Sequence, residues 1–309
     1  MEGRGSRTVQ PVRGDTMKPM AIRGECYPCL DQLITLTVEL ATPDPAVRRR
    51  AAQYARDLLA REFGPAAIPA AIANRLHPAI QQLTGNPDPF AARKAAATTL
   101  ASRLHRRLAP AYGDDLEALL HLAALGNALD FFREEAEVTQ EMLGGVNFGI
   151  SHLAGFNRQL AGPPGLLLFL ADNAGEQFFD RPLVAWLRRR GWRVVYVVKA
   201  GPIQNDLTRE DLTASGLGDT LEPVADTGTC TVGLHLEEVG PAFRGLYEAA
   251  DLIVAKGMGH FETMSQVADP RLYFLLQAKC APVAQSLGVE HNRFVFARGA
   301  GDAGQPAGR

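Results

Sequence analysis

The sequence predicts an α/β protein, with an N-terminal helical domain followed by a three-layer α/β/α domain that has a mainly parallel sheet. Up to about residue 160, apolar residues recur at the spacing of amphipathic helices, and no useful strand-like alternation is found. After Gly162-Pro163-Pro164-Gly165, short and wholly apolar runs alternate with helical segments. Such runs are typical of parallel strands that helices cover on both faces.

Four segments of the first half show helical periodicity: 45–61, 90–108, 116–124 and 134–142. The first two have favourable starts, because Asp44-Pro45 and Asp88-Pro89 each place an N-capping side chain beside a proline suited to the first helical turn. We therefore expect residues 21–160 to form the helical domain.

Six apolar segments of the second half are predicted as strands: 166–171, 192–198, 220–225, 252–255, 272–276 and 293–297. The third is the weakest of them. Helices are expected between the first two strands, as far as Arg190, and over 242–250. Residues 161–298 therefore form the predicted α/β domain, and the tails 1–20 and 299–309 are expected to be disordered.

The composition is that of a folded globular protein, with 46% hydrophobic and 21% charged residues in a chain of 309. The formal net charge of −2 gives no general attraction to nucleic acid or to an anionic membrane. No apolar run approaches the ~20 residues of a membrane helix, and the N-terminal tail lacks the apolar segment of a secretory signal. Four cysteines are too few for a disulfide scaffold at this length. We expect a cytoplasmic protein that binds neither nucleic acid nor membrane, and its oligomeric state is left open.

Polar residues follow three of the predicted strands. Asp172-Asn173 comes after the first, Asp206 after the second, and Lys256 after the fourth. In a parallel sheet, ligands bind at the carboxyl ends of the strands, so these side chains are expected to converge. Two carboxylates and an amide oxygen suit Mg²⁺ or Mn²⁺ better than a structural zinc ion. The sequence therefore predicts a divalent-cation site at this edge of the sheet.

Each of these residues also has a plain structural explanation when taken alone. An Asp after a strand is a common helix N-cap, and Lys256-Gly257-x-Gly259 lacks the third glycine of a dinucleotide fingerprint. Phosphatases that form an aspartyl intermediate carry a second Asp two positions after the first. Here that position is Ala174, which disfavours the covalent mechanism.

Five motifs in order carry a resemblance to a known family: Cys26-x-x-Cys29, Gly126-Asn127-x-x-Asp130-Phe131, Asp172-Asn173-Ala174-Gly175-Glu176, Pro202-Ile203-x-Asn205-Asp206-x-Thr208-x-Glu210-Asp211 and Lys256-Gly257-x-Gly259-x-Phe261-Glu262. The chain resembles the damage-control phosphatases, also described as acidic-residue-methyltransferase-like metal-binding domains. The resemblance runs from about Cys26 to Ala297, and the Cys-x-x-Cys is typical of the prokaryotic branch.

The resemblance implies that Asp172, Asn173 and Asp206 bind a divalent cation, and that Lys256 contacts phosphate. It also implies a set of substrate contacts: Asn127, Asp130, Ala174, Gly175, Gly257 and His260. Members of the family hydrolyse phosphate esters of small metabolites, among them sugar phosphates and damaged phosphometabolites, with Mn²⁺, Mg²⁺, Co²⁺ or Ni²⁺. We therefore expect a metal-dependent phosphomonoester hydrolase in which residues 161–298 are the catalytic domain.

Two residues of the motifs leave questions open. Glu176 is a candidate to accept a proton from the attacking water, and equally a partner of the helix dipole. Where the family pattern has Asn, this chain has His260. Imidazole donates a hydrogen bond as an amide does, but it titrates near neutrality and favours softer metals. We expect a shift in substrate scope or metal preference at this position.

Cys26 and Cys29 have zinc-ligand spacing, but a four-ligand site needs two more partners. Cys230 and Cys280 supply them only if the fold brings them close. The spacing favours structural thiols at a helix start first, then a second metal or active-site contact, and last a redox dithiol. The histidines other than His260 form no spaced ligand pair.

Two other functions remain open at this point. The family's second name suggests carboxyl methyl transfer from S-adenosylmethionine, although Asp172-Asn173 stands where such enzymes usually carry a glycine-rich loop. A non-catalytic module that holds a metal through the Cys-x-x-Cys is the other. Loss of Cys26 would abolish the function of such a module and leave phosphatase chemistry largely intact.

Overall fold

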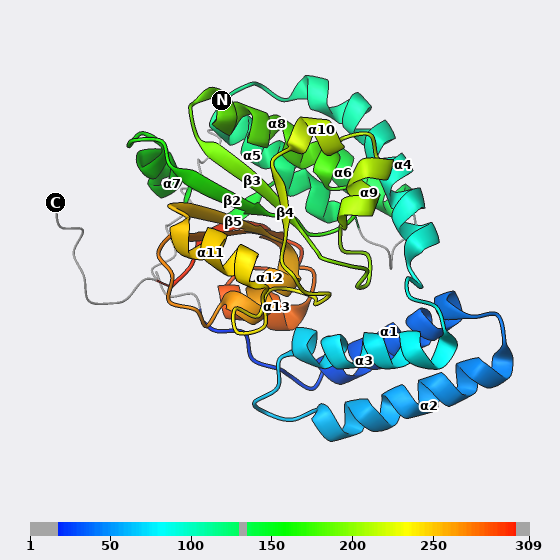
Figure 1. The fold of residues 1–309 in the computed structure, drawn as a ribbon. Helices are drawn as coiled ribbons and strands as arrows, with labels where there is room; N and C mark the ends of the chain where they lie inside the picture. Colours follow the sequence, from blue (N-terminus) through cyan, green and yellow to red (C-terminus); the bar gives the residue numbers. More distant parts are fainter. Residues whose placement is uncertain (1–17, 130–134, 301–309) are drawn as a thin grey trace, which may run out of the picture.

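A computed structural model describes residues 18–129 and 135–300 (Figure 1). Its centre is a seven-stranded sheet of order β1-β7-β6-β5-β2-β3-β4. The strands are β1 (Phe148–Ser151), β2 (Leu166–Leu170), β3 (Arg193–Val198), β4 (Val224–Asp226), β5 (Leu252–Lys256), β6 (Leu272–Gln277) and β7 (Phe294–Arg298). Neighbouring strands pair in parallel apart from β6 and β7, which are antiparallel. The predicted α/β class and mainly parallel sheet are confirmed.

Helices cover both faces of the sheet, which explains why its central strands are apolar throughout. Leu167 and Phe169 of β2 face one core, whereas Leu166 and Leu168 face the other. This alternation follows from the two-residue period of a strand. The first core is covered by α4 (Ala91–Leu108), α5 (Leu116–Leu125), α6 (Glu135–Leu143), α7 (Leu153–Leu160), α8 (Gln177–Arg189), α9 (Arg209–Ala214) and α10 (Gly218–Leu221). The second is covered by α11 (Pro241–Ala249), α12 (Gly257–Met264) and α13 (Ala281–Leu287).

The first three helices form a separate lobe below the sheet in Figure 1. They are α1 (Cys26–Ala41), α2 (Pro45–Glu62) and α3 (Pro69–Thr84), and they enclose an apolar core of their own. Asp44 caps α2 as predicted, since its side chain accepts the N–H groups of Ala46 and Val47. Gly85 ends α3 in the left-handed conformation, at φ 72°. α4 then leads the chain from this lobe to the sheet.

The structure corrects three expectations. β1 is a strand within residues 21–160, where only helices are predicted. Its four residues are too few for a periodic pattern, and its register with β7 is irregular. The predicted strand 220–225 is shorter than expected, because Gly218–Leu221 is helical and β4 begins at Val224. Met20 is not part of a loose tail, since it is buried and its N–H donates to Ser265 Oγ at 2.9 Å.

The helices of residues 21–160 belong to two different apolar cores, which helical periodicity alone does not reveal. α4–α7 contribute to a core on the sheet, so α1–α3 are the part of residues 21–160 that packs by itself. The domain boundary at residue 160 stays a prediction. Residues 1–17 and 301–309 of the predicted tails lie outside the described residues.

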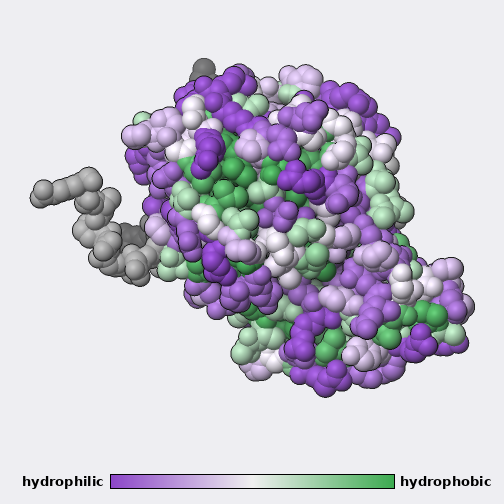
Figure 2. Space-filling model, viewed as in Figure 1, coloured by the Kyte–Doolittle hydropathy of each residue, from purple (hydrophilic) through white to green (hydrophobic). Residues whose placement is uncertain are grey.

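Polar side chains cover most of the face drawn in Figure 2, and apolar side chains gather over the sheet near β3, above α11. Within the described ranges, no helix has the length and apolar character needed to cross a membrane.

Candidate functional site

The carboxyl ends of β5, β2 and β3 lie side by side in the sheet, as the sequence predicts. The loops that follow β2 and β3 are joined by backbone hydrogen bonds. Leu207 N donates to Asp172 O at 2.8 Å, and Ala174 N donates to Asn205 O at 2.8 Å. These bonds place Asn173 opposite Asp206 in an isolated antiparallel bridge. The three predicted metal ligands are therefore brought together by the backbone itself.

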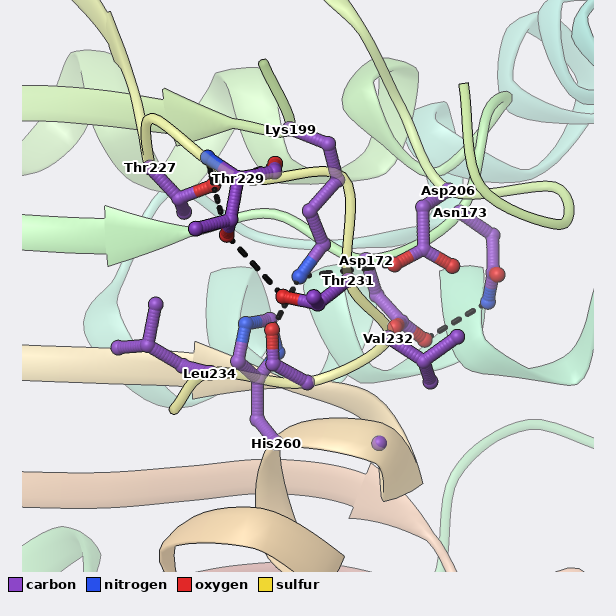
Figure 3. A network of polar contacts seen from close by, with 12 residues as sticks. Asp172, Asn173, Lys199, Asp206, Thr227, Thr229, Thr231, Val232, Leu234 and His260 are labelled. Atoms are coloured by element: carbon purple, nitrogen blue, oxygen red, sulfur yellow. Dashed lines mark hydrogen bonds and ion pairs between the residues drawn. The ribbon is translucent and has the colours of Figure 1, made fainter. Parts of the chain in front are cut away.

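The two carboxylates face a common space in Figure 3, with the Lys199 ammonium beside Asp206. Asn173 Nδ2 donates to Asp172 Oδ2 at 2.7 Å. Lys199 Nζ donates to Gly233 O at 2.5 Å and lies 3.5 Å from Asp206 Oδ2. That carboxylate oxygen is buried; the Lys199 ammonium is its ion-pair partner, and within the described chain it accepts no hydrogen bond of good geometry. One long ion pair leaves acceptor capacity on a buried carboxylate that a divalent cation would use.

Burial and nearby negative charge disfavour the charged forms of both carboxylates. Burial raises the pKa of Asp172 well above its ordinary value, and the nearby charges of Glu176 and Asp206 raise it further. Burial also raises the pKa of Asp206 to about 6, although Lys199 opposes the shift. A divalent cation between them would favour the ionised forms, so the donor set fits a hard metal ion.

Gly257 allows the end of β5 to approach this pair. Its φ is +80°, a conformation that side chains of L-residues rarely adopt, and a Cβ built there would overlap the Asp172 carboxylate. Glycine is therefore required here for two reasons, which explains its place after Lys256 in the motif.

Lys256 lies behind the cleft rather than in it, which corrects the expected phosphate contact. Its side chain is 0% exposed, and Nζ donates to Glu176 Oε2 at 2.8 Å, to Asp180 Oδ1 at 2.7 Å and to Ala123 O at 3.0 Å. Burial lowers the pKa of Lys256, but the two carboxylates outweigh it, so the net shift is upward. All three hydrogens of the ammonium are used, and none is left for a ligand.

Glu176 is equally enclosed, so it does not stand where an attacking water would be. Its Oε1 accepts from Asn173 Nδ2 at 2.8 Å, and its Oε2 accepts from Asn127 Nδ2 at 2.6 Å. Burial raises the pKa of Glu176, but Lys256 outweighs it, and the net shift is downward. A carboxylate so stabilised is a poor general base. Its contacts instead fix Asn173 and Asn127.

The expected backbone donors are also already engaged within the protein. Ala174 N donates to Asn205 O, Gly175 N to Gln177 Oε1 at 2.6 Å, and Glu176 N to Asn173 O at 3.1 Å. These amides shape the loop and are not directed at a ligand.

Of the other residues predicted to contact substrate, Asn127 and Gly257 line the cleft, whereas His260 does not. Asn127 lies in a short 3₁₀ turn, Gly126–Ala128, and lines the cleft together with Gly257. His260 is buried and does not line it; its Nδ1 lies 2.6 Å from Lys256 O. Burial, with help from Lys199, lowers the pKa of His260 to about 3, so the imidazole is neutral near pH 7. Asp130 lies outside the described residues.

The cleft itself has a volume of about 200 Å³ and runs between the sheet edge and the lobe of α1–α3. Five polar residues to which the sequence analysis assigned no role also line it: Gln204, Asn205, Glu262, Gln277 and Lys279. Asn205 and Glu262 belong to the motifs quoted above. Lys279 is the cation among the lining residues, and its Nζ donates to Leu129 O at 3.2 Å. It comes two residues after the end of β6, and Lys256 is the last residue of β5, so a search for polar residues at strand ends could also have found Lys279.

Among the described residues, the cysteines do not form the four-ligand zinc site that the spacing of Cys26 and Cys29 left open. Cys29 lines the cleft and Cys26 is buried behind it. Burial raises the pKa of Cys280 to about 12, and the nearby thiols of Cys26 and Cys29 contribute to the upward shift. Across residues 18–129 and 135–300, no three side chains of His, Cys, Asp or Glu are arranged as metal ligands. A metal ion between Asp172 and Asp206 would therefore need Asn173 as its third protein ligand.

Comparisons with known proteins agree with the fold and with the motifs. The family described as the damage-control phosphatase ARMT1-like domain matches residues 22–295. A damage-control phosphatase of Pyrococcus horikoshii is 35% identical over 284 residues, covering 90% of this chain and 98% of that protein. A damage-control phosphatase of Archaeoglobus fulgidus is 29% identical over 278 residues, covering 87% and 96%. A crystal structure of a DUF89 family protein from P. horikoshii superposes with a TM-score of 0.82 over 90% of this chain and 99% of that one, at 35% identity.

Proposed function

The chain belongs to the damage-control phosphatase ARMT1-like family, and on that premise we propose that it is a divalent-metal-dependent phosphatase acting on phosphate monoesters of small metabolites. The names of its relatives support phosphatase activity; the metal and the substrate class are our inference. The observation that supports the inference is the meeting of the buried Asp172 and Asp206 carboxylates at one sheet edge, with only the Lys199 ammonium, 3.5 Å from Asp206 Oδ2, as the cation recorded beside Asp206 among the described residues.

Asp172, Asn173 and Asp206 would hold the cation, and Mn²⁺, Mg²⁺, Co²⁺ and Ni²⁺ all accept such oxygen ligands. When bound, a divalent cation supplies charge stabilisation for the phosphoryl group and acidifies water. The protein's part is to keep the three ligands in register. Glu176 does so for Asn173 by accepting its Nδ2 hydrogen, which directs the amide oxygen away from Glu176.

Lys279 is the residue proposed to bind the phosphoryl oxygens, in place of Lys256. It projects into the cleft from the end of β6, at the same sheet edge as the carboxylates. Asn127 also lines the cleft, but its Nδ2 donates to Glu176 Oε2 at 2.6 Å and its Oδ1 is an acceptor, so the charge for the phosphoryl oxygens comes from Lys279. An ammonium at the cleft surface provides charge for a phosphate ester.

Phosphate release from p-nitrophenyl phosphate and a panel of small phosphate esters tests the proposal. Chelated protein receives Mg²⁺, Mn²⁺, Co²⁺ or Ni²⁺ in turn, with Asp206→Asn as the matched variant that keeps size and removes charge. We expect metal-dependent release that the variant lowers at least a hundredfold. Release that persists in chelator, or that Asp206→Asn leaves unchanged, would contradict the proposal.

A further inference from the structure

Among the described residues that line the cleft, Glu262 is a carboxylic acid to which the proposed function gives no task. The titratable residues of this lining are Cys29, Asp172, Asp206, Glu262 and Lys279. The two aspartates are the proposed cation ligands, and Lys279 is the proposed phosphate contact. Glu262 and Cys29 therefore remain without a part in the reaction.

The fold presents Glu262 to the cleft from α12, which lies between the sheet and the lobe of α1–α3 (Figure 1). Met258 and Gly259 of this helix also line the cleft, and residues three and four apart share a helix face. Gly257 opens the same helix beside the Asp172 carboxylate. Five residues of helix correspond to a rise of about 7.5 Å, which leaves room for a phosphoryl group between Asp172 and Glu262.

The protein engages one of the two carboxyl oxygens of Glu262. Its Oε2 accepts from Ala70 N at 3.0 Å, which fixes the side chain against α3. Within the described ranges this is the one hydrogen bond of the carboxyl group, so Oε1 is left to a ligand in the cleft. A protonated carboxyl group carries one O–H donor, and here that donor is available on Oε1.

The surroundings of Glu262 keep a proton on it near neutral pH. Burial raises the pKa of its carboxyl to about 7, and a proton donor works best when its pKa is close to the working pH. The titratable groups that interact with its charge are the thiols of Cys26 on α1 and Cys280 just before α13. Burial raises the pKa of both thiols, so they are neutral when Glu262 titrates.

We propose that Glu262 is the general acid of the reaction and donates its proton to the oxygen of the departing alcohol. Hydrolysis joins a water oxygen to phosphorus and breaks the bond between phosphorus and the alcohol oxygen, which keeps the electron pair. The proton of Glu262 converts that oxygen to a hydroxyl group. The attacking water loses one proton to solvent as phosphate forms, and the Glu262 carboxylate takes up one proton from solvent. The inference rests on the proposed phosphatase function and adds a catalytic residue to it.

Two esters that differ in their need for this proton test the assignment. p-Nitrophenyl phosphate releases a nitrophenolate, which departs without a proton. p-Nitrobenzyl phosphate has one further CH₂ group and must release an alkoxide unless its oxygen is protonated. Glu262→Gln keeps the size of the side chain and the acceptor for Ala70 N, but it removes the acidic proton.

At saturating metal, Glu262→Gln should lower kcat at least a hundredfold for the benzyl ester and less than threefold for the p-nitrophenyl ester. In the wild type, kcat for the benzyl ester should fall as the pH rises past about 7, since the acid loses its proton, and the variant should lack this decline. Cys29→Ser changes the other unassigned residue of the lining. It should alter kcat for both esters by the same factor and keep the decline with pH.

Equal losses for the two esters in Glu262→Gln, or an unchanged kcat for the benzyl ester, would overturn the inference. A loss confined to the benzyl ester in Cys29→Ser would also overturn it, because the proton would then come from the thiol. Metal-dependent hydrolysis of p-nitrophenyl phosphate without hydrolysis of the benzyl ester would do the same. If folded wild-type protein hydrolyses neither ester with any metal, the proposed function itself fails.

Discussion

Lys256 Nζ lies 2.8 Å from Glu176 Oε2, and neither side chain is exposed to solvent. This pair joins the end of β5 to the start of α8 directly beneath the candidate metal ligands. The motif lysine thus belongs to the frame that positions Asn173, while Lys279 is the cation that lines the cleft.

Lys256→Met should lower the free energy of unfolding by about 3–5 kcal/mol, because it leaves Glu176 and Asp180 buried without their counter-charge. Urea unfolding followed by circular dichroism measures the change. Lys18→Met, at an exposed lysine, serves as the control and should leave the midpoint unchanged. A variant of wild-type stability with a raised KM would instead place Lys256 at the substrate.

Lys279→Met should lower catalytic efficiency and leave stability largely unchanged, the reverse of the effect expected for Lys256→Met. We expect kcat/KM for a phosphate ester to fall by at least tenfold, since a desolvated contact between ammonium and phosphate is worth well over 1.4 kcal/mol. The urea midpoint should change far less than in Lys256→Met. Steady-state kinetics at saturating metal measures the first effect, and unaltered kinetics would show that Lys279 does not meet the phosphoryl group.

Gly257→Ala should abolish activity, because the new methyl group would overlap the Asp172 carboxylate. Gly85→Ala is a close control, since Gly85 also has a positive φ, at +72°, but a Cβ there meets nothing within 4 Å. Both variants carry the backbone penalty of about 1 kcal/mol for a non-glycine residue in this conformation. Comparable activity in the two variants would mean that the approach of β5 to Asp172 does not matter.

Stability should fall with rising pH through the titration of Glu262. Burial raises the pKa of this carboxyl from 4.5 to about 7, so the folded protein holds the proton more tightly than the unfolded chain does. Its contribution is therefore fully present below about pH 4.5 and is lost as the pH rises through 7. Because the side chain retains partial exposure, we expect about 2 kcal/mol rather than the full value of the shift.

Glu262→Gln keeps an acceptor for Ala70 N and removes the titration. Urea unfolding at pH 5 and pH 8 should show a smaller loss of stability for this variant than for the wild type. Equal losses in the two proteins would assign the pH dependence to other groups.

The meeting of the strand ends could be predicted from the sequence, because parallel strands joined by helices bring their carboxyl ends to one edge. Asp172, Asn173 and Asp206 follow from this rule alone. The place of Lys256 could not be predicted in this way. A strand-end lysine can point toward the cleft or beneath the sheet edge, and the choice depends on Asp180, one turn into α8, which carries no motif signal.

The contribution of α1 and α3 to the cleft could not be predicted from the sequence either. Leu33 and Ala73 have the periodicity of core residues, and they are core residues of the lobe. Only the docking of α1 and α3 against the sheet edge shows that the same side chains also line the cleft. β1 was missed for a simpler reason, since four residues with an irregular register leave no pattern to detect.

Binding of Mn²⁺ to chelated protein, followed by electron paramagnetic resonance, addresses the metal site without any assumption about substrate. We predict one Mn²⁺ per chain in the wild type, and affinity at least a hundredfold weaker in Asp206→Asn. Cys26→Ala should bind as the wild type does. Stoichiometric binding that survives Asp206→Asn and is lost in Cys26→Ala would contradict the assignment of the site to the strand-end carboxylates.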